Sequence, residues 1–324
     1  MKTLQELQAT VQALFASLPA DSQPATLYDP IHYTLSLGGK RIRPLLLLAA
    51  NDLCGGNLEQ ASDAAIGIEV FHNFTLLHDD LMDRSPLRRG QPTVYRKWNE
   101  NTAVLSGDTM FALAWQHLLR RPHTRLQDIL QTFNRTAIEV CEGQQYDMDF
   151  ETRTDVSLDD YLHMIRLKTA VLLACALKLG ALYAQAPDKE VETLYQIGLN
   201  LGLAFQLQDD LLDAYGDTTT FGKQTGTDIS DNKKTYLLLR ALEAGDAEQR
   251  ATLRKLFSCT PQDPEPKVAT VLDIYDRLHI RPHTEQAIAS YIDQAHALLR
   301  TLPQSDADKE PLRQIMQSLV NRNR

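Results

Sequence analysis

The sequence predicts an all-α protein. Apolar residues recur at helical spacing in one segment after another, strand signals are almost absent, and Pro, Gly or polar clusters separate the segments. We expect about ten to thirteen mostly antiparallel helices around one core, in a single domain that spans residues 1–324. No repeat of fixed period and no low-complexity linker indicates a second domain.

Composition and charge narrow the class of protein. Of the 324 residues, 43% are hydrophobic, which is enough for a core and argues against disorder. The net charge of −9 argues against nucleic acid or an anionic membrane as a partner. No apolar stretch is long enough to cross a bilayer, and the N-terminal residues carry no signal-peptide core. We therefore expect a soluble, cytoplasmic protein without a transmembrane segment.

The cysteines are also consistent with a cytoplasmic protein. They are widely spaced, lie mostly in apolar helical context and match no zinc or redox motif: Cys54, Cys141, Cys175 and Cys259. We expect buried, reduced thiols.

The first basic segment, Gly38–Pro44, places Lys40, Arg41 and Arg43 beside a pair of glycines and before an apolar helix. Pro44 stands at a plausible first helical position. Backbone donors, a helix start and fixed cations together suit a phosphate group. An ordinary charged helix start is the alternative.

The next apolar helix ends in three carboxylates, Asp79, Asp80 and Asp83. Its apolar positions recur at steps of three and four: Ile66, Val70, Phe74, Leu77 and Leu81. At about 100° per residue, Asp79 and Asp83 share a face, and Asp80 points roughly a quarter turn away. Like charges at this spacing repel, and carboxylates are disfavoured near a helix C-terminus. A bound Mg²⁺ would reverse both costs.

A basic loop, Arg84–Pro92, follows at once and contains adjacent Arg88 and Arg89. Neighbouring side chains diverge, so the two arginines could serve two different anions. A solvated basic loop is the alternative.

Further along, Ser157–Asp160 has the pattern of a capping box, and it opens a helix expected to carry Lys168 and Thr169. A later apolar helix ends in a second Asp-Asp-x-x-Asp motif, Asp209–Asp213, 130 residues after the first. A third basic set runs from Phe221 to Lys234.

The repetition of the acidic motif indicates a metal site. One such motif could be a solvated helix end. Two of them on apolar helices, in a chain with no nucleotide-binding fingerprint, are better explained as facing halves of one metal cluster. Each is followed by a basic loop, which favours a diphosphate held by Mg²⁺ together with Lys and Arg.

At this point the chain resembles the trans-isoprenyl diphosphate synthases of the polyprenyl synthetase family. The matching pieces span about 200 residues in the family's order: Gly38–Pro44, His72, His78–Asp83, Arg88–Gly90, Gly107–Asp108, Gly143–Gln144, Asp147, Lys168–Thr169, Gln206, Asp209–Asp213 and Gly222–Lys233. The paired Asp motifs together with Gly-Gly-Lys-x-x-Arg-Pro make this combination highly specific.

The resemblance implies an isoprenoid synthase fold with helices around a deep central cavity, and a homodimer. The Asp motifs would face each other across the cavity mouth and hold three Mg²⁺ ions. Asp79 and Asp83 would bind two of them and Asp209 the third, with Asp80 and Asp213 in support.

The same resemblance assigns two substrate sites. Four basic residues would hold or lie close to the allylic diphosphate: Arg88, Lys168, Lys223 and Lys233. Thr169 and Gln206 would lie near the developing cation. Isopentenyl diphosphate would sit on Gly39, Lys40, Arg43, His72 and Arg89. Helical phase supports His72, because seven residues before Asp79 is nearly two full turns; an ordinary core histidine is the alternative.

The implied enzyme is a Mg²⁺-dependent prenyltransferase that condenses isopentenyl diphosphate with an allylic diphosphate. The family's usual chain-length positions are Phe74 and Thr75, five and four residues before the first Asp motif. Phe71 could add a lower stop. A lone aromatic at Phe74 resembles enzymes that stop near twenty carbons, so we expect geranylgeranyl diphosphate as product. Alternatively, Phe74 is an ordinary core residue.

Other products and classes stay open. Farnesyl diphosphate is the nearest alternative, and a longer polyprenyl product is a more distant one. A terpene cyclase would share one Asp motif but not the isopentenyl site formed by Lys40, Arg43 and Arg89. A non-catalytic synthase subunit is disfavoured by the intact Asp motifs.

Overall fold

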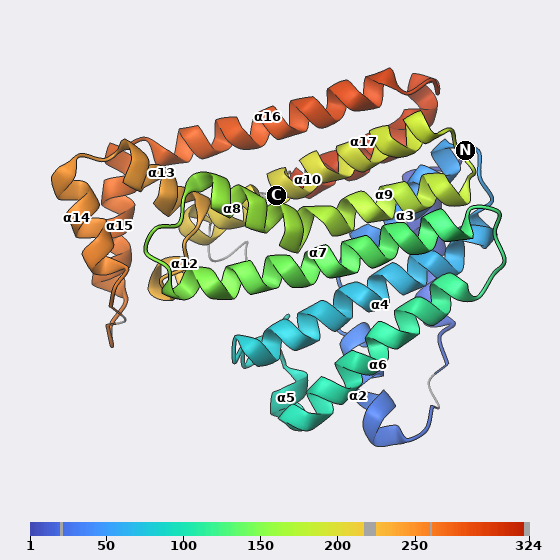
Figure 1. Ribbon diagram of the computed structural model, residues 1–324, viewed down its shortest axis with the longest axis horizontal. Coiled ribbons are helices and arrows are strands. Elements are labelled where there is room, and N and C mark those ends of the chain that lie inside the picture. Colours follow the sequence, from blue (N-terminus) through green and yellow to red (C-terminus); the bar gives the residue numbers. More distant parts are fainter. Residues whose placement is uncertain (20–21, 217–224, 260, 321–324) are drawn as a thin grey trace. The chain divides into compact units, whose positions relative to one another are not determined.

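The computed structural model describes residues 1–19, 22–216, 225–259 and 261–320, and the described chain is helical almost throughout (Figure 1). Eleven of its helices have twelve residues or more, and with the shorter ones the described chain has more helices than the ten to thirteen expected. These longer helices are α1 (Leu4–Ala16), α2 (Ala25–Ser36), α3 (Ile42–Leu53), α4 (Leu58–Met82), α6 (Glu100–Leu119), α7 (Leu126–Thr152), α9 (Val171–Tyr183), α10 (Asp188–Tyr215), α15 (Glu265–Arg277), α16 (Ile280–Thr301) and α17 (Asp306–Val320). The all-α prediction is confirmed.

Shorter elements complete the described chain. They are strands β1 (Leu87–Arg88) and β2 (Gln91–Pro92) and helices α5 (Val94–Lys97), α8 (Leu158–Ile165), α12 (Thr227–Ser230), α13 (Tyr236–Ala244) and α14 (Ala247–Leu256). A five-residue π-helix, Arg166–Ala170, joins α8 to α9. No helix in the described residues is long and apolar enough to cross a membrane.

The chain divides into two compact units. Unit 1 comprises Met1–Phe133, Cys175–Leu194 and Gln304–Ile315, and unit 2 comprises Asn134–Ala174, Tyr195–Pro303 and Met316–Arg324. The single domain and the deep central cavity stay predictions.

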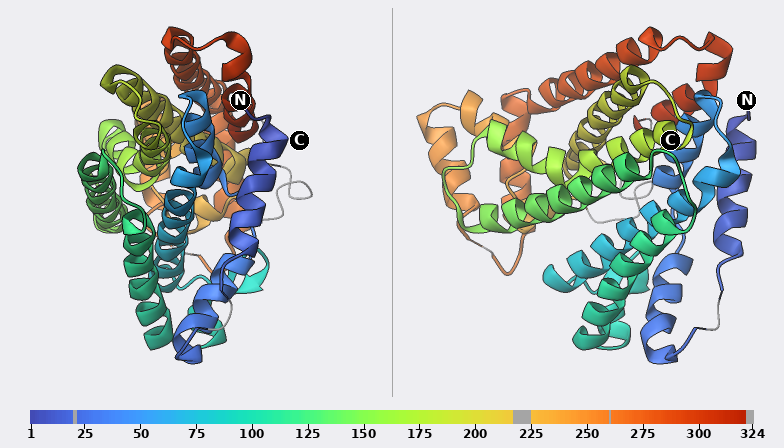
Figure 2. Two further views of the ribbon diagram at one scale, coloured as in Figure 1. Left: turned by 90° about the vertical axis from the view of Figure 1, so that its right-hand side faces the viewer. Right: turned by 45° about the vertical axis from the view of Figure 1, so that its right-hand side comes forward.

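Helix α4 is the central element of unit 1. It packs most extensively against α6 and next against α3, and α2 packs against both α4 and α6. Figures 1 and 2 show α4 and α6 side by side and antiparallel. An uninterrupted buried run from Ala64 to Phe71 explains the weak amphipathicity of α4, because neighbours cover this part of the helix on several sides. Its C-terminal end, which carries the first Asp motif, is more exposed.

The basic loop after α4 forms a small antiparallel hairpin. Leu87 pairs with Pro92, and Arg88 pairs with Gln91. The two turn residues, Arg89 and Gly90, both have positive φ, which matches the right-handed twist of a tight hairpin. The chain thus directs Arg88 and Arg89 differently.

Unit 2 has its own hydrophobic core. It is built from α8, the C-terminal half of α10, α12, α13, α14, α15 and α16, with Leu237, Val271 and Ile280 almost completely buried. The capping box predicted at Ser157–Asp160 is present, with both of its hydrogen bonds. Lys168 and Thr169 lie in the π-helix that follows α8, where the Val171 N–H bonds to the Arg166 carbonyl five residues earlier.

Two local predictions need correction. Helix α3 begins at Ile42, so Pro44 is its third residue; it is still in the first turn, where its missing N–H costs nothing. All four cysteines are free, as expected for reduced thiols, but only Cys175 is fully buried. Cys141 and Cys259 are exposed, because Cys141 faces solvent on α7 and Cys259 follows the end of α14.

Candidate functional site

The first Asp motif occupies the last turn of α4 and its C-cap. Asp79 is partly buried, Asp80 is buried, and Asp83 is exposed and caps the helix by donating its N–H to the Asp79 carbonyl at 2.8 Å. The phase argument therefore separated the three carboxylates correctly: the central one points into the protein, and the outer two do not.

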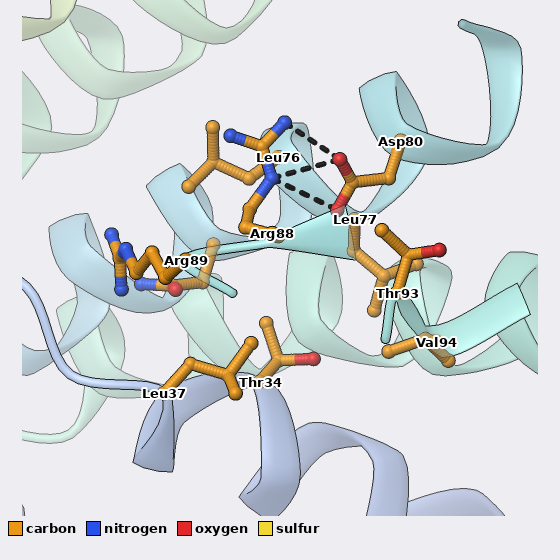
Figure 3. A pocket seen from close by; sticks show the side chains of 10 residues that line it. Thr34, Leu37, Leu76, Leu77, Asp80, Arg88, Arg89, Thr93 and Val94 are labelled. Atoms are coloured by element: carbon orange, nitrogen blue, oxygen red, sulfur yellow. Dashed lines mark hydrogen bonds and ion pairs between the residues drawn. The ribbon is translucent and has the colours of Figure 1, made fainter. Parts of the chain in front are cut away.

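Arg88 binds the central carboxylate. Its Nε donates to both oxygens of Asp80, at 2.8 and 2.9 Å, and a terminal nitrogen lies 2.6 Å from Oδ1 (Figure 3). Burial raises the pKa of Asp80 above its ordinary value, although Arg88 acts in the opposite direction. In this structure Arg88 is thus bound to the acidic motif.

Arg89 points away from Asp80 (Figure 3) and lies against Gly39. A Cβ on Gly39 would lie only 2.8–2.9 Å from three atoms of the Arg89 guanidinium, so the side chain rests directly against this glycine. Gly39 also has φ +126°, a conformation that residues with side chains rarely adopt. Only glycine allows both features.

His72 belongs to the same group. It lies on α4, and burial, then Arg43, Arg89 and Arg88, lower its pKa well below the ordinary value. Its imidazole is therefore neutral near pH 7. Gly39, Arg43, His72 and Arg89 thus form one local group in unit 1, and Lys40 is exposed in the same segment.

A small pocket, partly open to solvent, lies beside the hairpin (Figure 3). Asn73, Asp80, Arg88 and Arg89 supply its polar lining. Its remaining walls come from Thr34, Leu37, Leu76, Leu77, Thr93 and Val94.

The chain-length candidates lie in a group of aromatic rings. Phe71 is fully buried, and its ring centroid is 5.4 Å from that of Phe74. Phe74 is partly buried and also contacts Phe111 of α6, at 5.4 Å. The Thr75 hydroxyl donates to the His72 carbonyl at 2.8 Å. Sequence reasoning missed Phe111, because nothing in the sequence pairs α6 with this turn of α4.

The second Asp motif lies at the end of α10 in unit 2. Asp213 is buried and accepts hydrogen bonds from the Thr227 hydroxyl and, at 2.9 Å, from the Asp228 N–H. Asp209 is partly exposed. As in the first motif, the central carboxylate, Asp210, is the most deeply buried of the three.

Asp210 is held by three donors. The Tyr161 hydroxyl donates to it, and so do the Gln206 amide and the Tyr236 N–H, each at 3.2 Å. Burial, followed by nearby Asp228, raises the pKa of Asp210 to about 8.

The predicted residues of the π-helix reach the same region of unit 2. The Lys168 ammonium donates to Asp147 at 2.6 Å, and the Thr169 hydroxyl donates to the Gln206 carbonyl oxygen at 3.0 Å. A Cβ on Gly143 would lie 2.3 Å from the Lys168 backbone nitrogen, so this glycine allows α7 and the π-helix to approach closely. Hydrogen bonds thus connect Thr169 to Gln206, and Gln206 to Asp210 of the second Asp motif.

Two further basic residues were predicted here. Lys233 is exposed and donates its backbone N–H to the Asp228 carbonyl at 2.9 Å. Lys223 lies outside the described residues.

The donor set suits Mg²⁺. Within the described ranges, no three His, Cys, Asp or Glu side chains converge into a complete metal site. Mg²⁺ does not require one, because it usually binds one or two carboxylates and completes its shell with waters and substrate phosphates. Asp79, Asp83 and Asp209, whose carboxylates are less buried than the central ones, fit that role.

Comparisons with known proteins identify the family of this chain. Residues 24–275 match the polyprenyl synthetase family. The geranylgeranyl diphosphate synthase of Saccharolobus solfataricus is 37% identical over 309 residues, covering 92% of this chain and 91% of the relative. The geranylfarnesyl diphosphate synthase of Natronomonas pharaonis is 37% identical over 330 residues, covering 96% and 94%.

A solved structure is similar over its whole length. The crystal structure of a geranylgeranyl pyrophosphate synthase superposes with a TM-score of 0.94 at 44% identity and covers 100% of both chains. A family match over most of the chain, together with full-length relatives above 30% identity, settles membership. The chain is a prenyl-transferring enzyme of the polyprenyl synthetase family.

Proposed function

We propose that this enzyme condenses isopentenyl diphosphate with an allylic diphosphate to make a short-chain trans-polyprenyl diphosphate, geranylgeranyl diphosphate in particular. The observation that carries the proposal is the local group of Gly39, Arg43, His72 and Arg89, next to an Asp-rich helix end. A terpene cyclase needs no second diphosphate site of this kind.

The metal assignment follows from the two Asp motifs. We assign Asp79 and Asp83 to two Mg²⁺ ions and Asp209 to a third, with Asp80 and Asp213 in support. The burial of Asp80 and Asp213 supports this division, because each already accepts hydrogen bonds from protein donors. When bound, the metal ions neutralise charge on the departing diphosphate.

Each substrate has its own set of protein groups. Isopentenyl diphosphate binds to Gly39, Lys40, Arg43, His72 and Arg89. Arg88, Lys168, Lys223 and Lys233 serve the allylic diphosphate. Arg88 and Lys168 are paired with Asp80 and Asp147, and these pairs keep both cations positioned before substrate arrives.

The protein then stabilises charge as it develops. Basic side chains hold the leaving diphosphate, and the Thr169 hydroxyl and Gln206 amide oxygens, connected by a 3.0 Å hydrogen bond, lie near the allylic cation. The double bond of isopentenyl diphosphate attacks that cation. Loss of a proton to the departed diphosphate restores an alkene. Apolar surroundings keep water from the cation.

Phe74, Thr75 and Phe71 limit product length. Two observations support a stop near twenty carbons: the packing of the Phe74 ring against Phe71 and Phe111, and the names of full-length relatives. The geranylfarnesyl diphosphate synthase among the relatives shows that a longer product is compatible with comparable similarity.

We also propose that the enzyme is a cytoplasmic homodimer. Exposed apolar side chains on α6, namely Val104, Leu105 and Leu119, support an interface between two copies.

The test is an assay of purified protein with Mg²⁺, isopentenyl diphosphate and each allylic primer in turn, with products identified by mass. We expect a twenty-carbon diphosphate as the main product. A fifteen-carbon main product would favour the farnesyl alternative. A cyclised hydrocarbon formed without isopentenyl diphosphate would favour a terpene cyclase, and no turnover by the chain alone would favour a non-catalytic subunit.

A further inference from the structure

Glu69 is a buried acid next to the proposed isopentenyl diphosphate site, and the mechanism above does not use it. It lies on α4 one turn before His72, with only 4% of its surface exposed. Asn73 donates to the Glu69 backbone carbonyl at 2.8 Å and, more weakly, to its Oε1 at 3.4 Å. The other carboxyl oxygen, Oε2, is buried and has no hydrogen-bond partner within the described part of the chain.

Three arginines act electrostatically on this carboxyl group. Arg43 and Arg41 act on it from α3 and its N-cap, and Arg89 acts from the hairpin; all three lower the pKa of Glu69. Burial is the larger effect and raises that pKa above its ordinary value. Two of these arginines, Arg43 and Arg89, also act on His72. The acid therefore shares its cations with the proposed diphosphate site.

Because they share these arginines, the Glu69 carboxylate and a bound diphosphate compete for the same positive charge. When the site is empty, the positive field of these arginines offsets part of the cost of keeping the Glu69 carboxylate buried. A diphosphate on Arg43 and Arg89 would cancel much of that field, while the burial of Glu69 would remain. Protonated Glu69 is then the more stable form, because a neutral buried acid needs no compensating cation.

We propose that Glu69 is the internal counter-ion of the isopentenyl diphosphate site, and that it takes up a proton from solvent when the diphosphate binds. This inference rests on the proposed function, because it needs a diphosphate at Gly39, Arg43, His72 and Arg89. It adds a role for a residue that does not itself touch the substrate.

Proton uptake has a measurable consequence. Uptake of one proton weakens binding by up to about tenfold for each unit of rising pH. Glu69→Gln resembles the neutral acid and cannot take up a proton. It should therefore bind isopentenyl diphosphate more tightly than the wild type at alkaline pH, and with a shallower pH dependence.

The experiment is isothermal titration calorimetry of the full-length protein with isopentenyl diphosphate, without Mg²⁺ or an allylic substrate. It is run at pH 8 in two buffers of different ionisation enthalpy. At this pH the ligand is almost fully ionised, because the second phosphate pKa is about 6. We expect the wild-type heat to depend on the buffer, reporting uptake of up to one proton, and we expect Glu69→Gln to lose that dependence.

Glu139→Gln is the matched control. Glu139 is also a helical acid, 6% exposed, with an Oε2 that is buried and without a hydrogen-bond partner in the described chain, and it pairs with Arg135 in unit 2. Its substitution should leave proton uptake unchanged. His72→Gln removes the second titratable group of the site and so distinguishes its proton uptake from that of Glu69. This variant should retain most of the proton uptake.

Three outcomes would overturn the inference. A wild-type heat that is independent of the buffer does so without any variant. So does uptake that Glu69→Gln retains and His72→Gln loses, because the proton then belongs to His72. Uptake abolished equally by Glu139→Gln would make it a general effect of buried acids. If isopentenyl diphosphate is turned over but no proton is taken up, only this inference fails; if it neither binds nor reacts, the proposed function fails first.

Discussion

Gly39→Ala tests whether the absence of a side chain at Gly39 lets the Arg89 guanidinium adopt its position in the proposed isopentenyl diphosphate site. The added Cβ would meet the Arg89 guanidinium at 2.8–2.9 Å, so the side chain must retreat until the contact reaches an ordinary 3.4 Å or more. Gly38 provides the matched control, because it also has positive φ, +77°, but a Cβ there would meet no atom within 4 Å. Gly38→Ala thus strains the backbone and leaves Arg89 undisturbed.

The expected magnitudes differ between stability and binding. Positive φ costs each alanine variant about 1–3 kcal/mol, less than the stability of a typical protein, so both should fold. A hydrogen bond to a charged group contributes about 1.5–3 kcal/mol, so misplacing Arg89 should raise KM for isopentenyl diphosphate roughly ten- to a hundredfold. Gly38→Ala should change this KM by only a few-fold.

Steady-state kinetics with each substrate varied in turn measure the effect, and urea unfolding measures the common strain. For Gly39→Ala we expect a large change in KM for isopentenyl diphosphate and a small one for the allylic substrate. An equal rise in KM for both glycine variants would refute the reasoning, because backbone strain alone would then explain it. An unchanged KM in Gly39→Ala would remove Arg89 from the site.

Three further predictions follow from the described contacts. Phe74→Ala should lengthen the product, and Phe111→Ala should do so as well because the two rings are 5.4 Å apart; chromatography of the products checks both, and unchanged lengths would remove this pair as the stop. Tyr161→Phe should lower the free energy of unfolding by about 1–3 kcal/mol, because it removes a donor from buried Asp210; an unchanged urea midpoint would contradict this. Folding lowers the pKa of His72, so the unfolded chain binds a proton here more readily than the folded protein does. The free energy of unfolding therefore stays at its full value above the unfolded pKa of about 6.5 and decreases as pH falls from there toward the folded pKa. Urea unfolding at pH 7.5 and 5.5 should therefore show a smaller acid destabilisation in His72→Gln than in the wild type, and equal losses would count against it.

Local sequence patterns predicted some of the side-chain geometry of unit 1. The phase of α4 separated Asp80 from Asp79 and Asp83, and the structure buries the central residue. The divergence of Arg88 and Arg89 was also predictable, because adjacent residues point apart wherever the backbone is extended or turning. Such features depend on a few consecutive residues, which is why sequence alone sufficed.

Contacts made across elements were not predictable. The pairing of Arg88 with Asp80 depends on the hairpin folding back onto α4, and Tyr161 reaches Asp210 from a helix 49 residues away in sequence. Glu69 left one signal, an acid between Ile68 and Val70 in an apolar run, but periodicity cannot tell a buried charge from an exposed one. The facing of the two Asp motifs stays a prediction.

The π-helix at Arg166–Ala170 also has a consequence for protein engineering. One extra residue in the turn offsets the angular phase of α8 from that of α9 by about 100°. No single helical wheel can therefore describe residues 158–183. A mutant library designed on one wheel would target the intended face in either α8 or α9 and the wrong face in the other helix. Deleting one residue here would realign the wheels while rotating Lys168 and Thr169 away from Asp147 and Gln206, so this stretch accepts substitutions more safely than changes of length.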